Sequence, residues 1–287
     1  YEKVKSRNHT EIMLKSFGAD INVENLKIAA LLHDIGKFYQ RTDKSHSEEY
    51  KKYSQDDYGK NGAHAKWSCD FLDKYYNDDI VDLVLYHHNH TKSNYPDLCS
   101  ILKKADHHSA SEREDIDDTQ EVNKTPLISL FSKIVLEGND KVDEQYIPLN
   151  KLSLDDGSFN NLKPAAKKDT MGGWNLVPEY NRLWDEFNFE FELIQNKTDF
   201  NTLLALLKKY ASTMPSAAYK SKSDISLYDH SKTTAALAVS RYLFNRDGDV
   251  KLTQKDDLNC YLAIEGDISG IQKFIFKKYK NYSPKNK

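Results

Sequence analysis

The chain has 287 residues, 39% hydrophobic and 30% charged, which is the composition of a globular protein on the polar side. Its net charge of −3 excludes a general basic field for nucleic acid, so any contact of that kind must be local. The three cysteines exclude a disulfide framework and fit a reducing cytoplasm, and no apolar run is long enough for a membrane span. We therefore expect a cytoplasmic protein with no membrane partner and, because the sequence does not begin with Met, a fragment of a longer one.

Amphipathic helical periodicity dominates the first part of the chain. Residues 23–35 form the first expected helix, which stays apolar up to His33 and Asp34. The polar run that follows, residues 40–62, is expected to be an exposed loop. Further helices are expected over residues 63–76, 79–90 and 97–115.

The second part of the chain changes character twice. From Thr119 to about Gly173 the pattern loosens into strand-like pieces broken by Pro and Gly, which indicates an irregular insertion. Residues 260–276 then read as a strand, a Gly-Asp turn and a new helix, so we place a domain boundary near residue 255. Between these segments, helices are expected over residues 179–194, 199–212 and 226–245.

The pair His33 and Asp34 raises the question of function. Both ionisable groups follow an apolar helical run directly, and burying such a group without a partner costs several kcal/mol (roughly 2–7). A bound metal ion is one possible partner. Since a single His-Asp pair is more often a hydrogen-bonded structural pair, the rest of the sequence must supply the other ligands.

Several of the ten histidines stand where such ligands are needed. Imidazole and carboxylate groups near helix ends suit first-row divalent metals, and the absence of cysteine among them favours an open catalytic site over a closed structural one. A bound divalent metal lowers the pKa of water toward neutrality, and two ions can hold both sides of a phosphorus centre. The alternative for His87 and His88 is a solvated helix end that favours positive charge. His46, in the polar run, and His107, after Asp106, are interpreted as bystanders.

These residues carry a resemblance. The motif LLHDIGK, followed by His64, His87, His88 and Asp106, resembles the HD superfamily of metal-dependent phosphohydrolases. Further motifs are similar to the large signature subunit of type III CRISPR effector complexes, Csm type, over roughly residues 24–287. They are HDIGKFYQR, HAKWSCDFL, ADHHSASERED, ISLYDHSKTTAALA and, above all, AIEGDISGIQKFIF.

The resemblance implies a mainly α fold. A circularly permuted helical HD domain with a few short strands would occupy residues 1–255, with the irregular segment inserted near 119–173. The first strand and helix of an α+β ferredoxin-like palm domain would follow over residues 256–287. Complete palm domains of this family make cyclic oligoadenylate from ATP. No Gly-Gly-Asp-Asp motif is present, so we expect that activity and its ATP to lie outside this chain.

The implied activity is a metal-dependent nuclease for single-stranded DNA. Its cofactor would be one or two divalent transition metal ions, with Mn, Ni or Co preferred. CRISPR RNA and target RNA would be met through the other subunits of the effector complex. Two alternatives stay open: an HD phosphohydrolase acting on nucleotides or cyclic nucleotides, which would need a closed pocket with base-stacking groups, and a non-catalytic HD scaffold.

The site residues follow from the same resemblance. The implied metal ligands are His33, Asp34, His64, His87, His88, Asp106 and His230. His33 and Asp34 are also expected to be catalytic, together with Lys37, a phosphate contact or else a salt bridge at a helix end. His230 resembles the histidine of the helix that opens a non-permuted HD domain. The stretch that leads from His9 to the HD pair also resembles the start of an ordinary, non-permuted HD domain. His9 is therefore the alternative to His230 as the remaining ligand.

Permutation has a structural consequence. The helix over residues 226–245 must pack beside the helix that ends at His33, with small side chains that let the two backbones approach closely. We expect Ala235, Ala236 and Val239 to face Ile28 and Leu32.

Overall fold

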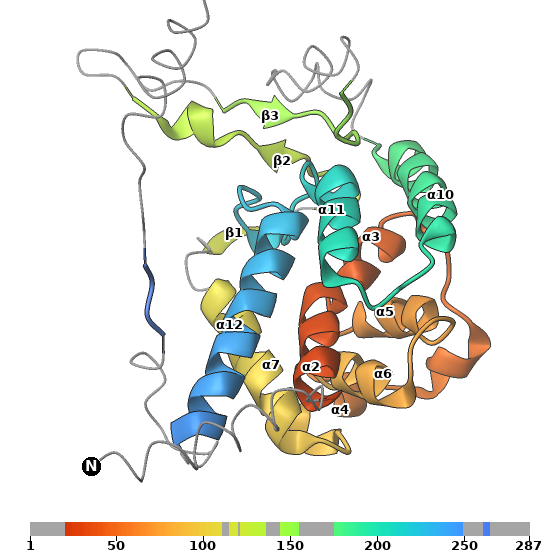
Figure 1. The fold of residues 1–287 in the computed structure, drawn as a ribbon. Helices are drawn as coiled ribbons and strands as arrows, with labels where there is room; N and C mark the ends of the chain where they lie inside the picture. Colours follow the sequence, from red (N-terminus) through yellow and green to blue (C-terminus); the bar gives the residue numbers. More distant parts are fainter. Residues whose placement is uncertain are drawn as a thin grey trace, which may run out of the picture. The chain divides into compact units, whose positions relative to one another are not determined.

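A computed structural model describes residues 21–110, 115–119, 121–135, 144–154, 175–248 and 261–264 (Figure 1). The chain divides into two compact units, residues 1–254 and 255–287, and each is described by itself. The mainly helical class expected from the sequence is confirmed. Among the described residues, no helix has the length and apolar character to cross a membrane.

The elements of the first unit are mostly short helices. The α-helices are α2 (Ile21–Leu32), α3 (Ile35–Gln40), α4 (Gln55–Tyr58), α5 (Ala65–Leu72), α6 (Asp78–Leu85), α7 (Pro96–Ser109), α10 (Val177–Leu193), α11 (Phe200–Ala211) and α12 (Leu227–Gly248). Single turns of 3₁₀ helix are η1 (Glu48–Lys52), η2 (His90–Lys92) and η3 (Leu130–Lys133). The strands β1 (Asp115–Thr119) and β4 (Tyr219–Ser221) pair antiparallel, as do β2 (Leu127–Ile128) and β3 (Tyr146–Ile147).

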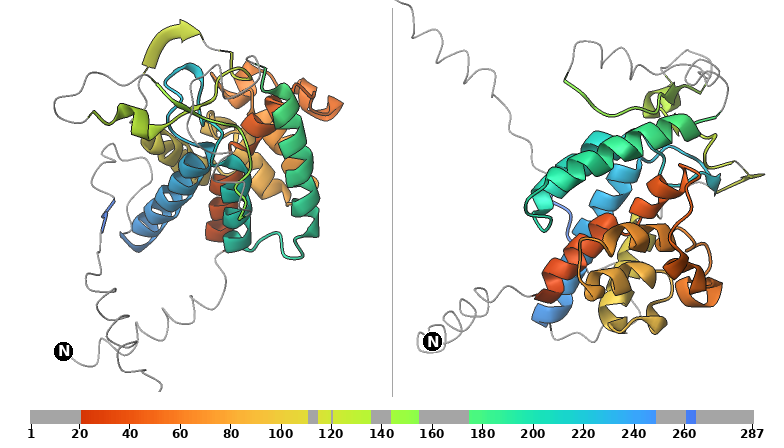
Figure 2. Two further views of the ribbon diagram at one scale, coloured as in Figure 1. Left: turned by 90° about the horizontal axis from the view of Figure 1, so that it is seen from above. Right: turned by 90° about the vertical axis from the view of Figure 1, so that its right-hand side faces the viewer.

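Helix α2 lies at the centre of this unit. It packs against α6, α7 and α12, and α12 also packs along α7 (Figure 2). All residues from Ile28 to Leu32 are buried, which is the pattern of a helix that is apolar on every side because neighbours surround it. The end of α2 therefore lies inside the protein, and whatever follows Leu32 is buried as well.

Helix α12 uses a different face from the one expected. Ala235 and Ala238 are buried in the core, but Ala236 is exposed and Val239 is only half-buried. The expectation for Ala236 is wrong, because the inward stripe follows the i, i+3, i+4 spacing from Ser231 and leaves position 236 outside it, whereas the half-buried Val239 lies on that stripe. The expected close approach of α12 to α2 is nevertheless present.

Helix α10 holds the next layer together through aromatic side chains. Trp184 and Phe187 pack on Phe38 of α3, with ring centroids 5.0 and 5.8 Å away, and both also pack on Phe71 of α5. Each fully buried aromatic ring of this kind contributes roughly 1.5–3 kcal/mol. This cluster fixes α3 against α5.

Other sequence expectations need correction. Residues 40–62 are not simply an exposed loop: they contain η1 and α4, and Arg41 and Tyr50 are buried. The Arg41 guanidinium donates to the carbonyl oxygen of Pro215, 2.6 Å away, so a distant segment covers it. The helix expected over 97–115 ends at Ser109, and Asp115 already begins β1. The strand and helix expected at 260–276 lie largely outside the described residues.

Candidate metal centre

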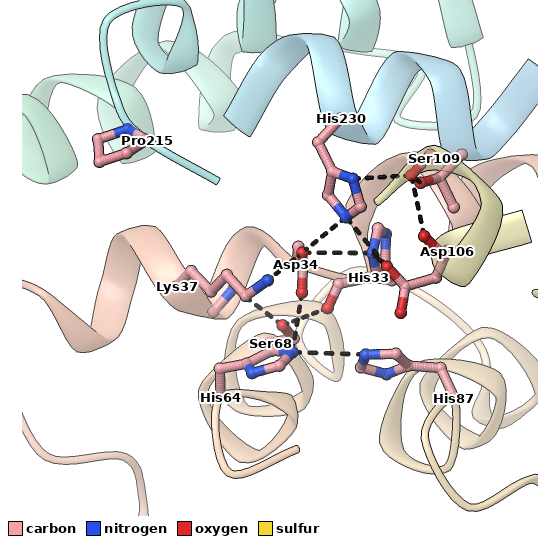
Figure 3. A network of polar contacts seen from close by, with 12 residues as sticks. His33, Asp34, Lys37, His64, Ser68, His87, Asp106, Ser109, Pro215 and His230 are labelled. Carbon is pink, nitrogen blue, oxygen red and sulfur yellow. Dashed lines mark hydrogen bonds and ion pairs between the residues drawn. The ribbon is translucent and has the colours of Figure 1, made fainter. Parts of the chain in front are cut away.

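The turn between α2 and α3 consists of His33 and Asp34, with side chains 0% and 1% exposed. Asp34 occupies the N-cap position of α3, yet its carboxylate makes no capping hydrogen bond. It faces a group of imidazoles instead (Figure 3). The sequence thus ends an apolar helix where its next two side chains can only point into the interior.

Gly36 brings the start of α5 against this turn. Its amide donates to Oγ of Ser68 at 2.8 Å, and that hydroxyl donates to the carbonyl oxygen of His33 at 2.7 Å. A Cβ at Gly36 would lie 2.1 Å from the carbonyl oxygen of His64, so no larger residue fits without a backbone shift. The glycine of the HDIGK motif therefore explains how His64 reaches Asp34.

The first group of potential ligands lies around His33. Its members are His33, Asp34, Asp106 and His230, all buried, with one ligand atom of each within 4.8 Å of the others. Asp106 comes from the last turn of α7 and His230 from the first turn of α12. Nε2 of His230 lies 3.1 Å from Oδ1 of Asp106 and 3.2 Å from Oδ2 of Asp34. The structure thus brings together residues nearly two hundred positions apart in the chain.

A second group adjoins the first through Asp34. It consists of His64, His87 and His88, again with ligand atoms within 4.8 Å of one another. Oδ1 of Asp34 lies 2.8 Å from Nε2 of His64, while its Oδ2 faces His230. Asp34 is the carboxylate that both groups share.

The remaining histidines differ in position. His107, interpreted from the sequence as a bystander, is exposed but has a ligand atom within 4.8 Å of those of His88 and Asp106. The ring of His46 packs on Trp67, and its Nδ1 contacts the carbonyl oxygen of Ser47. His9 lies outside the described residues.

The hydrogen bonds of the imidazoles suit a metal. Nδ1 of His33 donates to the carbonyl oxygen of Ala30 at 2.9 Å, and Nδ1 of His87 donates to that of Val84 at 2.6 Å. A carbonyl can only accept, so in the neutral rings Nε2 carries the lone pair that a metal needs. Nε2 of His33 is buried without a hydrogen-bond partner among the described residues, although carboxylate oxygens lie 3.4 and 3.6 Å away. The donor set therefore fits a divalent transition metal.

The first group contains charged side chains: two carboxylates and the imidazole of His33. Burial alone raises the pKa of the Asp34 carboxyl, but His33, Lys37 and His64 hold it well below its usual range. Burial likewise acts to raise the pKa of Asp106, which His230 and His33 hold low. Burial alone lowers the pKa of His33, yet the two carboxylates raise it to about 10. His33 is therefore a buried cation beside the two carboxylates, and Lys37 supplies a second positive charge next to Asp34.

The second group is neutral. Burial lowers the pKa of His64 and of His87, and it lowers that of His88 to about 3. All three imidazoles are uncharged at neutral pH, which is the form that binds a metal.

A cleft of about 530 Å³ leads to both groups. Lys37 lines this cleft, with Nζ 2.5 Å from Oδ2 of Asp34, and Lys60 lines it as well. The other lining residues are Gln40, Arg41, Asn61, Ala63, His64, His88, Asp106, His107, Ala110, Val122, Ser216, Ala217 and Ala218. Among the described residues that line it, none is Phe, Tyr or Trp.

Sequence reasoning missed the residues that support the ligands. Gly36 and Ser68 form the contact between α3 and α5, and Ser109 contacts Nδ1 of His230 at 2.7 Å. The glycine of the HDIGK motif, Gly36, was the one feature of the sequence that could have indicated this close helix contact. Ser68 and Ser109 lie within the motifs HAKWSCDFL and ADHHSASERED, but nothing in these motifs indicates which atoms the two hydroxyls contact.

The chain is similar to several proteins of known description. Residues 7–111 match the family model described as HD domain, a range that includes His9. The CRISPR system single-strand-specific deoxyribonuclease Cas10/Csm1 (subtype III-A) of Methanocaldococcus jannaschii is 29% identical over 305 residues, covering 91% of this chain and 35% of the relative. The protein of the same description from Enterococcus italicus is 26% identical over 288 residues, covering 88% of this chain and 34% of the relative.

A solved structure supports the fold. The crystal structure of a Csm1-Csm4 cassette in complex with cA4 matches with a TM-score of 0.50 and 20% identity, over 78% of this chain and 28% of that chain. The chain spans about a third of the length of the curated relatives it matches. The resemblance to type III CRISPR large subunits stated from the motifs is thus confirmed.

Proposed function

We propose that this chain is the nuclease part of a type III-A CRISPR large subunit and cleaves single-stranded DNA with a divalent metal. The observation that carries this proposal is the convergence of imidazoles and carboxylates on Asp34, at the wall of a cleft that also carries Lys37 and Lys60. The relatives' description as single-strand-specific deoxyribonucleases supports it.

The two groups offer places for one or two ions. His33, Asp34, Asp106 and His230 would hold one, and His64, His87 and His88 would hold a second beside Asp34. When bound, a divalent ion such as Mn, Ni or Co supplies Lewis acidity, which lowers the pKa of water and offsets charge on a phosphodiester.

The protein's own groups orient the substrate. Lys37 is half-buried at the cleft wall, where its ammonium can donate to a phosphate oxygen as well as to Asp34. Lys60 adds a second positive charge to the lining of the cleft, which would strengthen the attraction of a phosphate backbone. The exposed His107 lines the cleft beside Asp106 and can contact the same backbone.

The cleft offers contacts to a phosphate backbone rather than to a base. Its described lining has lysines but no aromatic ring on which the base of a nucleotide could stack. Small residues such as Ala110, Ala217 and Ala218 leave room for a backbone to pass. The converging ligands also argue against a scaffold without catalysis, because such a cluster is costly to bury for structure alone.

The cellular setting is part of the same proposal. The chain would work in the cytoplasm with the other subunits of a type III-A effector complex, through which it would meet CRISPR RNA and target RNA. ATP would be used by palm domains beyond the described residues.

A substrate panel tests the proposal. Purified protein is incubated with linear single-stranded DNA, the matching duplex, free nucleotides and cyclic nucleotides, with Mn²⁺ or with chelator. We expect Mn²⁺-dependent cleavage of the single strand, slow cleavage of the duplex because it is too stiff for the cleft, and no turnover of nucleotides. The variant His33→Ala with Asp34→Ala should be inactive. Equal rates on both DNA forms, turnover of nucleotides only, or full activity of the double variant would contradict the proposal.

A further inference from the structure

Arg41 is a buried cation with no carboxylate partner among the described residues. It is 3% exposed and occupies the C-cap position of α3. Its guanidinium contacts neutral groups: Nη1 donates to the carbonyl oxygen of Pro215 at 2.6 Å and to the hydroxyl of Tyr180 at 3.4 Å. The exposed Arg182, in contrast, pairs with two glutamates of α10. Because arginine keeps its charge in proteins, only dipoles offset the charge of Arg41.

The remaining donors of Arg41 are open to the cleft. A guanidinium has five N–H groups, and both hydrogen bonds of Arg41 use Nη1. Nε and Nη2 have no hydrogen-bond partner in the described part of the chain, yet neither belongs to the polar atoms that the protein encloses without a partner. Arg41 lines the cleft that leads to the two ligand groups. The edge formed by Nε and Nη2 can therefore bind an anion there through two parallel hydrogen bonds.

The guanidinium is held in place by the protein itself. Pro215 lies in a stretch that pairs with the residues just before α12, where the amide of Ser216 donates to the carbonyl oxygen of Ile225 at 2.8 Å. On the other side, the ring centroid of Tyr180, which is 0% exposed, lies 5.7 Å from Cζ of Arg41. A side chain that is already ordered loses little conformational entropy when it binds a ligand, which favours binding.

Arg41 lies at the far end of α3 from the candidate metal centre. Asp34 precedes the helix and Arg41 follows it, so about 10 Å along the helix axis separates them. Lys37 and Arg41 are one turn apart, and both line the cleft. Lys37 is paired with Asp34, whereas Arg41 has no hydrogen bond or ion pair to any of the candidate metal ligands, all of which are described. The cleft thus has one cation beside the metal centre and another a helix length away.

We propose that Arg41 binds a phosphate of the DNA strand other than the one that is cleaved. With the scissile phosphodiester at the metal centre, the strand continues along α3, and a further phosphate accepts hydrogen bonds from Nε and Nη2 of Arg41. This inference rests on the proposed function, because it adds a second contact to the strand which that function cleaves. It also predicts that a nucleotide with a single phosphate cannot use both contacts.

Binding of single-stranded DNA in chelator measures this contact, because Arg41 needs no metal for it and the strand stays uncut. Arg41→Gln should weaken binding of a fluorescent oligonucleotide by about 10–100-fold, as for a lost hydrogen bond to a charged group. The slope of log affinity against log salt concentration should fall by about 0.7, which corresponds to one phosphate contact on a single strand. The matched control Arg182→Gln removes an arginine that does not line the cleft and should change neither. Wild-type affinity and slope in Arg41→Gln would overturn the inference.

Neutral linkages show whether Arg41 contacts a phosphate directly. Short strands with one methylphosphonate, which lacks the phosphate charge, are compared linkage by linkage. The wild-type protein should lose affinity at several linkages. At one of them Arg41→Gln should lose none further, because the contact is already absent. Equal losses in the two proteins at every linkage would mean that Arg41 acts only through the fold, and would overturn the inference.

Arg41→Lys takes the place of Arg41→Gln if that variant does not fold. Lysine keeps the charge but cannot donate two parallel hydrogen bonds, so its loss at the same linkage should be smaller than that of the wild type. An equal loss at every linkage again overturns the inference. Cleavage of single-stranded DNA with Mn²⁺ decides the proposed function separately. Cleavage by the wild type without any effect of Arg41 refutes this inference alone, and absence of cleavage refutes the function on which it rests.

Discussion

The amide of Gly36 donates a hydrogen bond to Oγ of Ser68, 2.8 Å away, across the contact between α3 and α5. The contact is so close that any Cβ at Gly36 would overlap the backbone around His64. One glycine thus sets the distance between the turn that carries Asp34 and the helix that carries His64.

Gly36→Ala should therefore damage both stability and the site. We expect a loss of about 1–3 kcal/mol in the free energy of unfolding, because the added methyl meets backbone that cannot move freely. Ser68→Ala, which removes the hydrogen bonds without adding bulk, should keep more of the Mn²⁺ affinity. Denaturant unfolding and Mn²⁺ titration measure the two effects. A Gly36→Ala protein with wild-type stability and affinity would show that the contact is not rigid.

Asp34→Asn should weaken metal binding in both groups at once. The change keeps the size of the side chain but removes the charge that His64 and His230 both face. We expect bound metal, measured by elemental analysis after dialysis, and single-strand cleavage to fall together. Asp82→Asn is the matched control, since Asp82 is a buried carboxylate whose partners are Ser93 and Asn94. Loss of metal in the control but not in Asp34→Asn would refute the shared role.

Metal binding should release about one proton near neutral pH. The pKa of His33 is raised to about 10, so this ring is charged in the metal-free site and must lose a proton to become a ligand. Between pH 6.5 and 8, Mn²⁺ affinity should rise about tenfold per pH unit. Calorimetry in two buffers of different ionisation enthalpy measures the proton release. Identical binding enthalpies in both buffers would contradict the charged state of His33.

The metal-free protein should lose stability as the pH falls below 6.5. His64, His87 and His88 have folded pKa values lowered from 6.5, so the unfolded chain takes up their protons first. The slope is at most about 1.4 kcal/mol per pH unit for each ring. The stabilising charge on His33 is complete below pH 6.5 and is lost only toward pH 10, so it does not mask this loss.

Urea unfolding in chelator at pH 7, 6 and 5 measures this slope. His88→Asn should reduce it, because one of the buried neutral rings is then absent. A free energy of unfolding that stays level from pH 7 to 5 would mean that these rings are not kept neutral by burial.

Local patterns in the sequence determined which helices end in ionisable groups. The apolar run up to Leu32 forces His33 and Asp34 inside, and the same logic applies to His87 after α6. Helical periodicity depends on residues three and four apart, so a single sequence contains it. The family motifs added His230 to the expected ligands and left His9 as an alternative. The local pattern of the sequence could not decide between the two histidines.

Only the tertiary structure decided which of these groups meet. The inward face of α12 runs through Ala235 and Ala238 because α2 and α7 pack on that side, and no feature of the helix by itself selects it. Arg41 is buried because Pro215, far along the chain, supplies its acceptor. Ser109 likewise contacts His230 only because α7 and α12 pack together. The packing energy that brings separate helices together is spread over the whole core, so the sequence near either residue does not reveal the contact.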